Sequence, residues 1–334
     1  MSEIRDRAFV SAKMVAERAG VSRSAVSRTF THGASVSETT RRKVLSAAEE
    51  LGYHVNRLAR GLIQERSHII CLVVADLASP FRSRMLDAII RRLQALDRVA
   101  MVIDTEGHRE GVEAALRQTL HYRADATVVL SGTPAASLIE TCVASGQRVV
   151  LINRDDRLEG AENVGVDNAA AAREAFFLLR RAGCTRLAVV SSDAGTPALV
   201  ARERAFVAAA GEAGYGVEVT RAGPTGYVSG LEAARQLFGR SAEPDGVFCV
   251  TDLLAMGFMD GARIDFGRRI PQDLCVVGFD DIEQAGWESY MLTTFRQPIE
   301  AMADHVVARL IGAPGEADSR TFQALPTWRK SVRP

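Results

Sequence analysis

The stretch Met14–Phe30, MVAERAGVSRSAVSRTF, has the pattern of two short helices joined by a tight turn. Gly20 ends the first helix, because glycine enters the left-handed conformation without a steric penalty. Ser22 is placed to cap the second helix, and its apolar residues Val26 and Phe30 share one face because they are four positions apart. The stretch therefore predicts a helix-turn-helix.

The other face of the second helix is short, polar and basic. A face of this kind suits the major groove of DNA, where arginine can bond to both acceptors of guanine. The same pattern also fits a small helical hairpin with a solvated charged surface, so it does not decide the function alone. The residues on this face are Arg23, Ser24, Ser27 and Arg28.

A third helix is predicted to begin after Ser37 and to end at Gly52, which would let three helices enclose one small core. A linker with helical character follows at residues 54–66. The residues of this block that match the pattern of a known family are Val15-Ala16, Ala19-Gly20-Val21-Ser22, Val26-Ser27-Arg28, Val36-Ser37, Thr40-Arg41, Val44, Ala47, Leu51-Gly52-Tyr53, Asn56, Ala59-Arg60 and Leu62. With these residues in this order, the sequence resembles the lac-repressor (LacI/GalR) family of transcriptional regulators.

The resemblance implies a set of DNA contacts. Base readers lie on the second helix, phosphate contacts lie around it, and the linker contacts the DNA beyond them. Leu62 is expected to wedge into the minor groove at the operator centre, although packing between two paired linkers would also explain an apolar residue there. The three sets are Arg23, Ser24 and Arg28; Lys13, Ser22, Ser27, Thr40 and Arg41; and Asn56, Arg57, Arg60 and Leu62.

Charge is unevenly distributed along the 334 residues, although the chain has 41 basic and 41 acidic residues in total. Residues 1–66 carry 12 Lys and Arg against 7 Asp and Glu, and the remainder carries 29 against 34. A basic head on an acidic body is typical of a DNA-binding domain joined to a ligand-binding domain.

The five cysteines are widely spaced and form no C-x-x-C pair, so we interpret them as buried thiols of a reducing cytosol. The sequence shows no apolar signal core near residue 1 and no apolar run of the roughly 20 residues that a membrane span needs. We therefore expect a cytoplasmic protein with no membrane partner.

From Ser67 onward, apolar runs alternate with helix-length segments, which predicts an α/β fold with parallel sheets covered on both faces. The number of strand–helix units is too large for one sheet, which favours two doubly wound subdomains with a cleft between them. The expected strands are 69–75, 99–103, 126–130, 148–152, 186–190, 216–220, 246–250 and 274–279, and the helices between them include 82–96, 109–121, 169–182, 200–213 and 253–264.

This part of the chain resembles the periplasmic-binding-protein-like (type I) sugar-binding domain of the same family. The residues that carry the resemblance are Ser79-Pro80-Phe81, Asn153-Arg154, Val166-Asp167-Asn168, Arg202, Asp252, Val277-Gly278-Phe279-Asp280-Asp281 and Leu292-Thr293-Thr294-Phe295-Arg296-Gln297-Pro298. Most of them follow a predicted strand, where ligands of open parallel sheets bind.

The resemblance implies an effector site in the cleft. Arg202 is expected to fork onto ligand hydroxyls or a carboxylate, with Arg204 as a close competitor, and Asp280 is expected to accept bonds from sugar hydroxyls. Its neighbour Asp281 is expected to cap a helix that begins at Ile282. The full expected set is Asp76, Ser79, Phe81, Arg82, Asn153, Arg154, Arg202, Thr251, Asp252, Asp280 and Trp287.

Two departures from the family pattern leave the ligand open. Thr251 stands where many relatives carry asparagine, and Thr225 stands where an aromatic residue is common. Trp287 could supply the missing stacking surface, or it could pack against the cleft rim. A sugar, a sugar acid or another small polar molecule all remain compatible with these residues.

The predicted organisation is a helix-turn-helix head at 1–53, a hinge linker at 54–66 and an effector-binding and dimerisation domain at 67–334. Within that domain, subdomain 1 is expected at about 67–165 and 298–322, and subdomain 2 at about 166–297 and 323–334. The chain is expected to cross back near 294–298, which brings the helix 299–311 to subdomain 1.

The function expected from the resemblance is that of a homodimeric regulator, with repression favoured. It would bind double-stranded, pseudo-palindromic operator DNA under the control of a small carbohydrate-like effector. No nucleotide-binding, nucleophile-elbow or zinc-protease motif occurs, so no enzyme, catalytic residue, cofactor or metal is predicted. The alternative is a solute-binding or sensor protein without operator-specific DNA binding.

Overall fold

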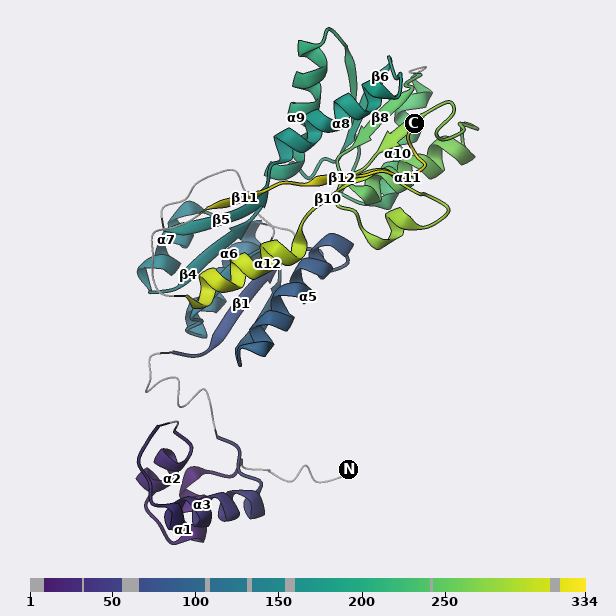
Figure 1. The fold of residues 1–334 in the computed structure, drawn as a ribbon. Coiled ribbons are helices and arrows are strands. Elements are labelled where there is room, and N and C mark those ends of the chain that lie inside the picture. The colour runs from purple at the N-terminus through teal and green to yellow at the C-terminus, as the bar shows by residue number, and fades with distance from the viewer. Residues whose placement is uncertain are drawn as a thin grey trace, which may run out of the picture. The chain divides into compact units, whose positions relative to one another are not determined.

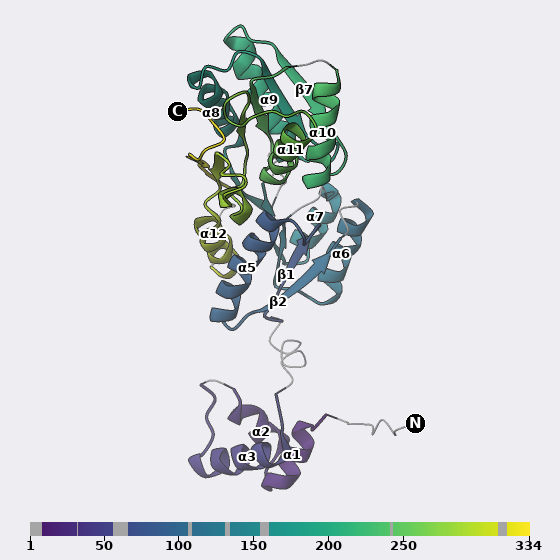
Figure 2. The ribbon, with the colours of Figure 1, turned by 90° about the vertical axis from the view of Figure 1, so that its right-hand side faces the viewer.

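The computed structural model describes residues 9–31, 33–55, 66–105, 109–130, 134–153, 160–240, 243–312 and 319–334. The chain divides into two compact units, residues 1–67 and 68–334, and each is described by itself. Figures 1 and 2 show the helices and strands of both units from two directions.

Among its described residues, the first unit has three short helices, and each begins after a serine whose hydroxyl accepts a backbone N–H of the first turn. Gly20 ends the first helix in the left-handed conformation, with φ of 65°, as the sequence predicts. The helices are α1 (Ala12–Ala19), α2 (Arg23–Thr29) and α3 (Glu38–Leu51).

A small core holds these helices together. Val15 of α1, Val26 of α2 and Val44 of α3 are fully buried against one another, and Phe30 packs against Tyr53 with a ring-centroid separation of 5.6 Å. Because each helix contributes one apolar face, the opposite faces remain available for contacts with other molecules.

The second unit has two lobes, and the first is built on a six-stranded parallel sheet with the order β11-β5-β4-β3-β1-β2. Alternate residues along its strands enter two separate cores. Leu72 of β1 packs on the side of α5 and α12, whereas Val73 packs on the side of α6 and α7. The strands are β1 (Ile69–Val74), β2 (Val99–Asp104), β3 (Ala126–Val129), β4 (Arg148–Ile152), β5 (Ala161–Val166) and β11 (Arg320–Phe322), and the helices are α5 (Pro80–Ala95), α6 (Arg109–His121), α7 (Ala136–Ala144) and α12 (Ile299–Ile311).

The second lobe is built on a four-stranded parallel sheet with the order β7-β6-β8-β9. Helices α8 and α9 pack against each other, and α10 and α11 form the other closely packed pair. The strands are β6 (Leu187–Ser191), β7 (Val217–Arg221), β8 (Gly246–Cys249) and β9 (Cys275–Val277), and the helices are α8 (Asn168–Arg181), α9 (Pro197–Glu212), α10 (Tyr227–Gly239) and α11 (Asp252–Ile264).

The chain passes between the lobes at three places. It leaves the first sheet after β5 and enters α8, it returns after β10 (Thr294–Arg296) into α12, and it passes back from β11 to β12 (Leu325–Thr327). Strands β10 and β12 pair antiparallel, so two of the crossings lie side by side (Figure 1). These crossings bring residues far apart in sequence to the junction of the lobes.

The predicted α/β class with parallel sheets is confirmed, and most expected strands and helices agree with the observed ones within a few residues. Strand β5 and the short strands β10, β11 and β12 were absent from the expected set. Each of the last three has only three residues, too few for a periodic pattern to be visible. Among the described residues, no helix is long and apolar enough to cross a membrane.

Replacing Gly257 by alanine is expected to lower the free energy of unfolding by about 3 kcal/mol, the upper end for overpacking. A Cβ at Gly257 of α11 would overlap the backbone carbonyl of Tyr227 on α10, and backbone cannot move aside as a flexible side chain can. Urea unfolding of the full chain measures the change. Gly211→Ala in α9 is the matched control, because a Cβ there meets nothing within 4 Å and should cost no stability. Equal stability of the two variants would contradict the packing argument.

Candidate functional site

Helix α2 presents the polar face that the sequence predicts. Arg23, Ser24, Ser27 and Arg28 are exposed, whereas Ala25 and Val26 of the same helix are buried in the core of the head. Arg28 Nε donates to the Ser24 carbonyl at 3.3 Å, which holds its side chain along the exposed face. Two arginines and two hydroxyls on a single short face are suited to base edges and phosphates.

The predicted phosphate contacts take several structural roles. Ser22 Oγ accepts the Ala25 N–H at 3.2 Å and so caps α2, and Thr40 is hydrogen-bonded to the capping Ser37. Arg41 donates to the Thr29 carbonyl at 3.2 Å, where it stabilises the C-terminal end of α2. Lys13 lies on α1, 3.8 Å from Glu17. Their contacts with DNA remain predictions, and the predicted linker residues Asn56, Arg57, Arg60 and Leu62 lie outside the described residues.

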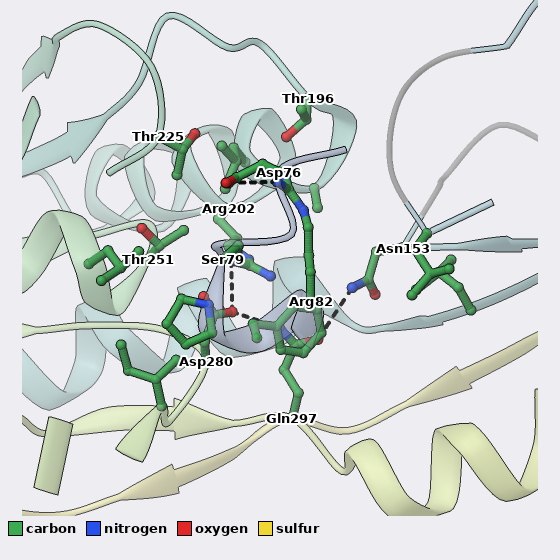
Figure 3. Close-up of a pocket in the computed structure, with 18 of the residues that line it drawn as sticks. Asp76, Ser79, Arg82, Asn153, Thr196, Arg202, Thr225, Thr251, Asp280 and Gln297 are labelled. Carbon is green, nitrogen blue, oxygen red and sulfur yellow. Dashed lines mark hydrogen bonds and ion pairs between the residues drawn. The ribbon is translucent and has the colours of Figure 1, made fainter. Parts of the chain in front are cut away.

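In the second unit, a cavity of about 110 Å³ lies between the two lobes, at the carboxyl ends of their strands (Figure 3). Of the predicted effector residues, the structure brings eight to this cavity, namely Asp76, Ser79, Phe81, Arg82, Asn153, Arg202, Thr251 and Asp280. Arg154 lies outside the described residues. The cavity also has lining residues that were not predicted as effector residues, among them Ile152, Thr196, Leu199, Thr225 and Gln297.

Three polar lining residues have a left-handed backbone. Asp76 follows β1 with φ of 58°, Asn153 follows β4 with φ of 54°, and Asp280 follows β9 with φ of 121°. Non-glycine residues in this region are strained, and such strain concentrates where a fold positions functional side chains. The left-handed backbone at these positions therefore directs the three side chains toward the cavity.

Arg202 is the most deeply placed cation of the cavity, with only 3% of its surface exposed. Its Nε donates to Asn168 Oδ1 and its NH1 to the Val250 carbonyl, both at 2.8 Å, while the guanidinium lies 3.5 Å above the Phe279 ring. Burial lowers the pKa of Arg202 to about 10, which still leaves it charged at neutral pH. The nearby Asp280 carboxylate, 3.6 Å away, is its counter-charge.

A chain of amides connects the two lobes across the cavity. Gln297, after the crossing strand β10, donates to Asp280 Oδ1 at 2.7 Å and accepts from Asn153 Nδ2 at 3.4 Å. Asn153 Oδ1 in turn accepts the Val166 N–H at 3.3 Å, just before the crossing into α8. The side chains of Figure 3 thus tie the end of β4 to the loop after β9. Gln297 stood in the motif that carried the resemblance, but its role as a bridge depends on the crossings, which the sequence does not display.

Three residues lie in surroundings that differ from those predicted from the sequence. Asp252 is fully buried behind the cavity wall, where its carboxylate accepts from the Ile282 N–H and the Thr294 hydroxyl. Asp281 does not cap the following helix, because its carboxylate pairs with Arg296 and Arg329 and the short helix η1 (Glu283–Gly286) has no side-chain cap. Trp287 is half exposed and does not line the cavity, so the structure gives no stacking role to it.

Asp252→Asn is expected to make the free energy of unfolding depend less strongly on pH between about 4 and 7. Burial, followed by the Asp280 carboxylate, raises the pKa of Asp252 from 3.8 to about 7 in the folded chain. The folded chain therefore keeps a proton that the unfolded chain has released, and stability falls as pH rises from about 4 to about 7, by at most about 1.4 kcal/mol per pH unit. Asparagine does not titrate, and it can still accept from Ile282 and donate to the Thr294 hydroxyl.

The measurement is the melting temperature of the wild type and of Asp252→Asn at pH 5 and pH 7.5. The melting temperature of the variant should rise relative to that of the wild type as pH rises, because only the wild type has to ionise the carboxyl group of Asp252. The same difference at both pH values would show that Asp252 does not titrate in this range.

The chemistry of the cavity is that of binding. Its charged side chains are paired with each other, and its remaining polar groups are hydroxyls and amides that can exchange hydrogen bonds with a polar ligand. Within the described part of the chain, no group of three or more His, Cys, Asp or Glu side chains is placed to hold a metal ion. A helix-turn-helix head joined to a two-lobed, parallel-sheet domain with a binding cavity is the architecture of a ligand-responsive class of transcriptional regulators.

Comparison with known proteins agrees with this class. Residues 13–56 match the model of the bacterial regulatory proteins of the lacI family, and residues 178–332 match that of the periplasmic binding protein-like domain. The chain is 30% identical to the HTH-type transcriptional regulator GalR of Escherichia coli (strain K12) over 295 residues, which cover 87% of this chain and 85% of GalR. The chain therefore belongs to the lacI family of regulatory proteins, and it is a helix-turn-helix transcriptional regulator rather than an enzyme.

Two solved structures have the same fold. The lac repressor dimer bound to operator and an anti-inducer matches with a TM-score of 0.89 at 22% identity, over 98% of this chain and 100% of that one. The complex of the transcriptional regulator CelR with cellobiose matches with a TM-score of 0.71 at 27% identity, over 96% of this chain and 99% of that one.

Proposed function

We propose that this regulator binds a pseudo-palindromic operator as a homodimer and that a small, uncharged, carbohydrate-like ligand in the cavity changes its affinity for that operator. The observation that carries the proposal is the cavity itself. Side chains from both lobes and from a crossing segment line it, so a ligand would bind the lobes together. Relatives with the same fold include a regulator in complex with cellobiose and a repressor bound to operator, which supports both halves of the proposal.

The pairing of charges in the cavity favours an uncharged ligand. Arg82 lies 3.0 Å from Asp76, and the second arginine, Arg202, lies 3.6 Å from Asp280. An anionic ligand would have to displace a carboxylate from a buried arginine, and a cationic one would have to compete with that arginine for the carboxylate. Hydroxyls can instead donate to the aspartates and accept from the arginines without breaking either pair. A neutral polyol therefore fits better than a sugar acid or a sugar phosphate.

The dimer is supported by an open sheet edge. Strand β2 is the last strand of its sheet and pairs with β1 on one side alone within the described residues. Its Val99 and Val102 are 49% and 39% exposed. Exposed apolar edges invite association, and a two-fold dimer would present two heads to two half-sites.

Repression rather than activation, a cytoplasmic location and the predicted domain and subdomain boundaries belong to the same proposal. A cytoplasmic location is proposed because a regulator acts where the DNA is. The crossings near residues 167, 297 and 323 support the proposed boundaries at about 165, 298 and 322. The predicted base, phosphate and effector contacts are likewise part of the proposal.

The proposal is tested by thermal shift of the full-length protein with panels of neutral sugars, sugar acids and sugar phosphates. A neutral sugar should raise the melting temperature, and its affinity should change when operator DNA is present, by the same factor as it changes DNA affinity. Equal ligand affinity with and without operator would contradict the coupling. Ligand binding without any operator-specific DNA binding would instead favour a solute-binding or sensor protein.

A further inference from the structure

Two of the five cysteines lie against each other at the end of the second lobe's sheet that is remote from the cavity. Cys184 lies in the turn between α8 and β6, and Cys275 is the first residue of β9. Both side chains are fully buried, and both residues contact the Asp245 carbonyl, which accepts from the Cys184 thiol at 3.2 Å and from the Cys275 backbone N–H at 2.9 Å. Neither takes part in a disulfide in this structure.

A glycine on the strand between them makes this approach possible. Gly246 is the register partner of Leu187 on one side and of Cys275 on the other. A Cβ at Gly246 would lie 2.7 Å from Cys184 Cβ and 3.0 Å from its Sγ. The Cys184 side chain therefore occupies the space over a strand position that has no side chain, beside Cys275 on the next strand, and any other residue at Gly246 would displace Cys184.

The penultimate residue places a positive charge on the pair. Arg333 donates from its guanidinium to Cys184 Sγ at 3.2 Å and from its backbone N–H to Cys275 Sγ at 3.4 Å. Its other guanidinium bonds go to the carbonyls of Ala182, Pro271 and Gln272, which fix it in place. Arg333 is itself partly exposed, so the pair lies one side chain below the surface.

These contacts distinguish the pair from the remaining cysteines. The neighbouring Cys184 side chain, with help from Arg333, lowers the pKa of Cys275 below its usual value, whereas the pKa of Cys184 is raised. Burial raises the pKa of Cys71 to about 12, and it also raises the pKa of Cys142 and Cys249. Because the thiolate is the nucleophile, reactivity should concentrate at Cys275.

We propose that Cys184 and Cys275 are a redox-active dithiol that hydrogen peroxide converts into an intramolecular disulfide. The Cys275 thiolate attacks one peroxide oxygen, the O–O bond breaks, and a sulfenic acid and hydroxide form. The Cys184 sulfur then attacks the Cys275 sulfur, the S–O bond breaks, and the thiol proton leaves with the hydroxyl group as water. The hydroxide takes up a proton, so two thiols and one peroxide give one disulfide and two waters.

Oxidation at this position would act on the segment that leads to the cavity. The tail residue Ser331 bonds to both backbone groups of Val276 in β9, next to Cys275. After β9 the chain continues through Phe279 to Asp280, whose carboxylate lines the cavity. A covalent bond between Cys275 and Cys184 would replace the sulfur contacts that hold Arg333, and therefore change how the tail supports β9.

The test counts thiols in the full-length protein. After treatment with hydrogen peroxide and denaturation, the wild type should retain three of its five thiols, and peptide mapping without reductant should join the peptides of Cys184 and Cys275. The rate of disulfide formation should rise with pH as the Cys275 thiolate fraction grows.

Two variants separate the pair from general oxidation. Cys142→Ser is the matched control, since Cys142 is equally buried in the first lobe, and it should still lose two thiols on treatment. Cys184→Ser should form no intramolecular disulfide. The proposal is overturned if the treated wild type keeps five thiols, if the disulfide joins other cysteines, or if Cys184→Ser loses two thiols as the wild type does.

Discussion

Replacing Arg202 by methionine is expected to abolish ligand binding and to lower the free energy of unfolding by about 3–5 kcal/mol. The guanidinium is 3% exposed and bonds to Asn168 and to the Val250 carbonyl, beside the Asp280 carboxylate. Methionine fills a similar volume but leaves these acceptors without a donor in a dry environment, which is where an unpaired charge is most costly. Urea unfolding and ligand titration of the same sample measure the two effects.

Arg204→Met is the matched control for this prediction. Arg204 lies two residues further along α9, is exposed, and does not line the cavity. Its replacement should change stability by less than about 0.5 kcal/mol and leave ligand affinity unchanged. Arg202→Lys keeps the charge but loses the planar fork, so it should fold better than the methionine variant and still bind ligand poorly. If both Arg202 variants bound ligand with the affinity of the wild type, Arg202 would not be a ligand-binding residue.

Replacing Arg23 by alanine is expected to weaken operator binding by about 1–3 kcal/mol, or roughly 5- to 150-fold in affinity. Arg23 is the first residue of α2 and is exposed on the face that carries Ser24, Ser27 and Arg28. If it reads a guanine, the loss should be large on the selected operator and small on operators that already lack that base pair. Anisotropy titrations at one fixed salt concentration measure both values.

Arg42→Ala serves as the charge-matched control for Arg23→Ala. Arg42 is exposed on α3 and is outside the predicted contact set, so its loss should reduce affinity for all DNA sequences by a similar, small factor. An Arg23→Ala effect that is equally small and equally independent of sequence would contradict base reading by α2.

The head could be predicted from the sequence almost completely, because its determinants are local. Serine caps, the glycine stop at Gly20 and the i, i+4 apolar pairs each act within a few residues, and the observed helices follow them. The apolar strands of the second unit were equally visible, since buried parallel strands are nearly continuous runs of β-branched and aliphatic residues.

The cavity could be predicted only where a motif carried it. Asp76 could be named because it follows an apolar strand, and Asn153 and Asp280 because they stand in motifs that resemble the family's, and the structure brings all three together. The bridging role of Gln297 could not, because it depends on a crossing strand of three residues. Asp252 was expected at the ligand because it is one of the residues that carry the same resemblance. Burial behind the loop at Gly278, where a Cβ would overlap its carboxylate, is a tertiary effect that periodicity does not reveal.

The most direct test of ligand-controlled operator recognition is an in vitro selection of DNA from a random pool with the full-length protein, run with and without a mixture of neutral sugars. We expect enrichment of a palindrome whose half-sites contain a guanine read by α2, and a clear change in that enrichment when the sugars are added. No enriched sequence in either arm, over a range of salt concentrations, would contradict this expectation.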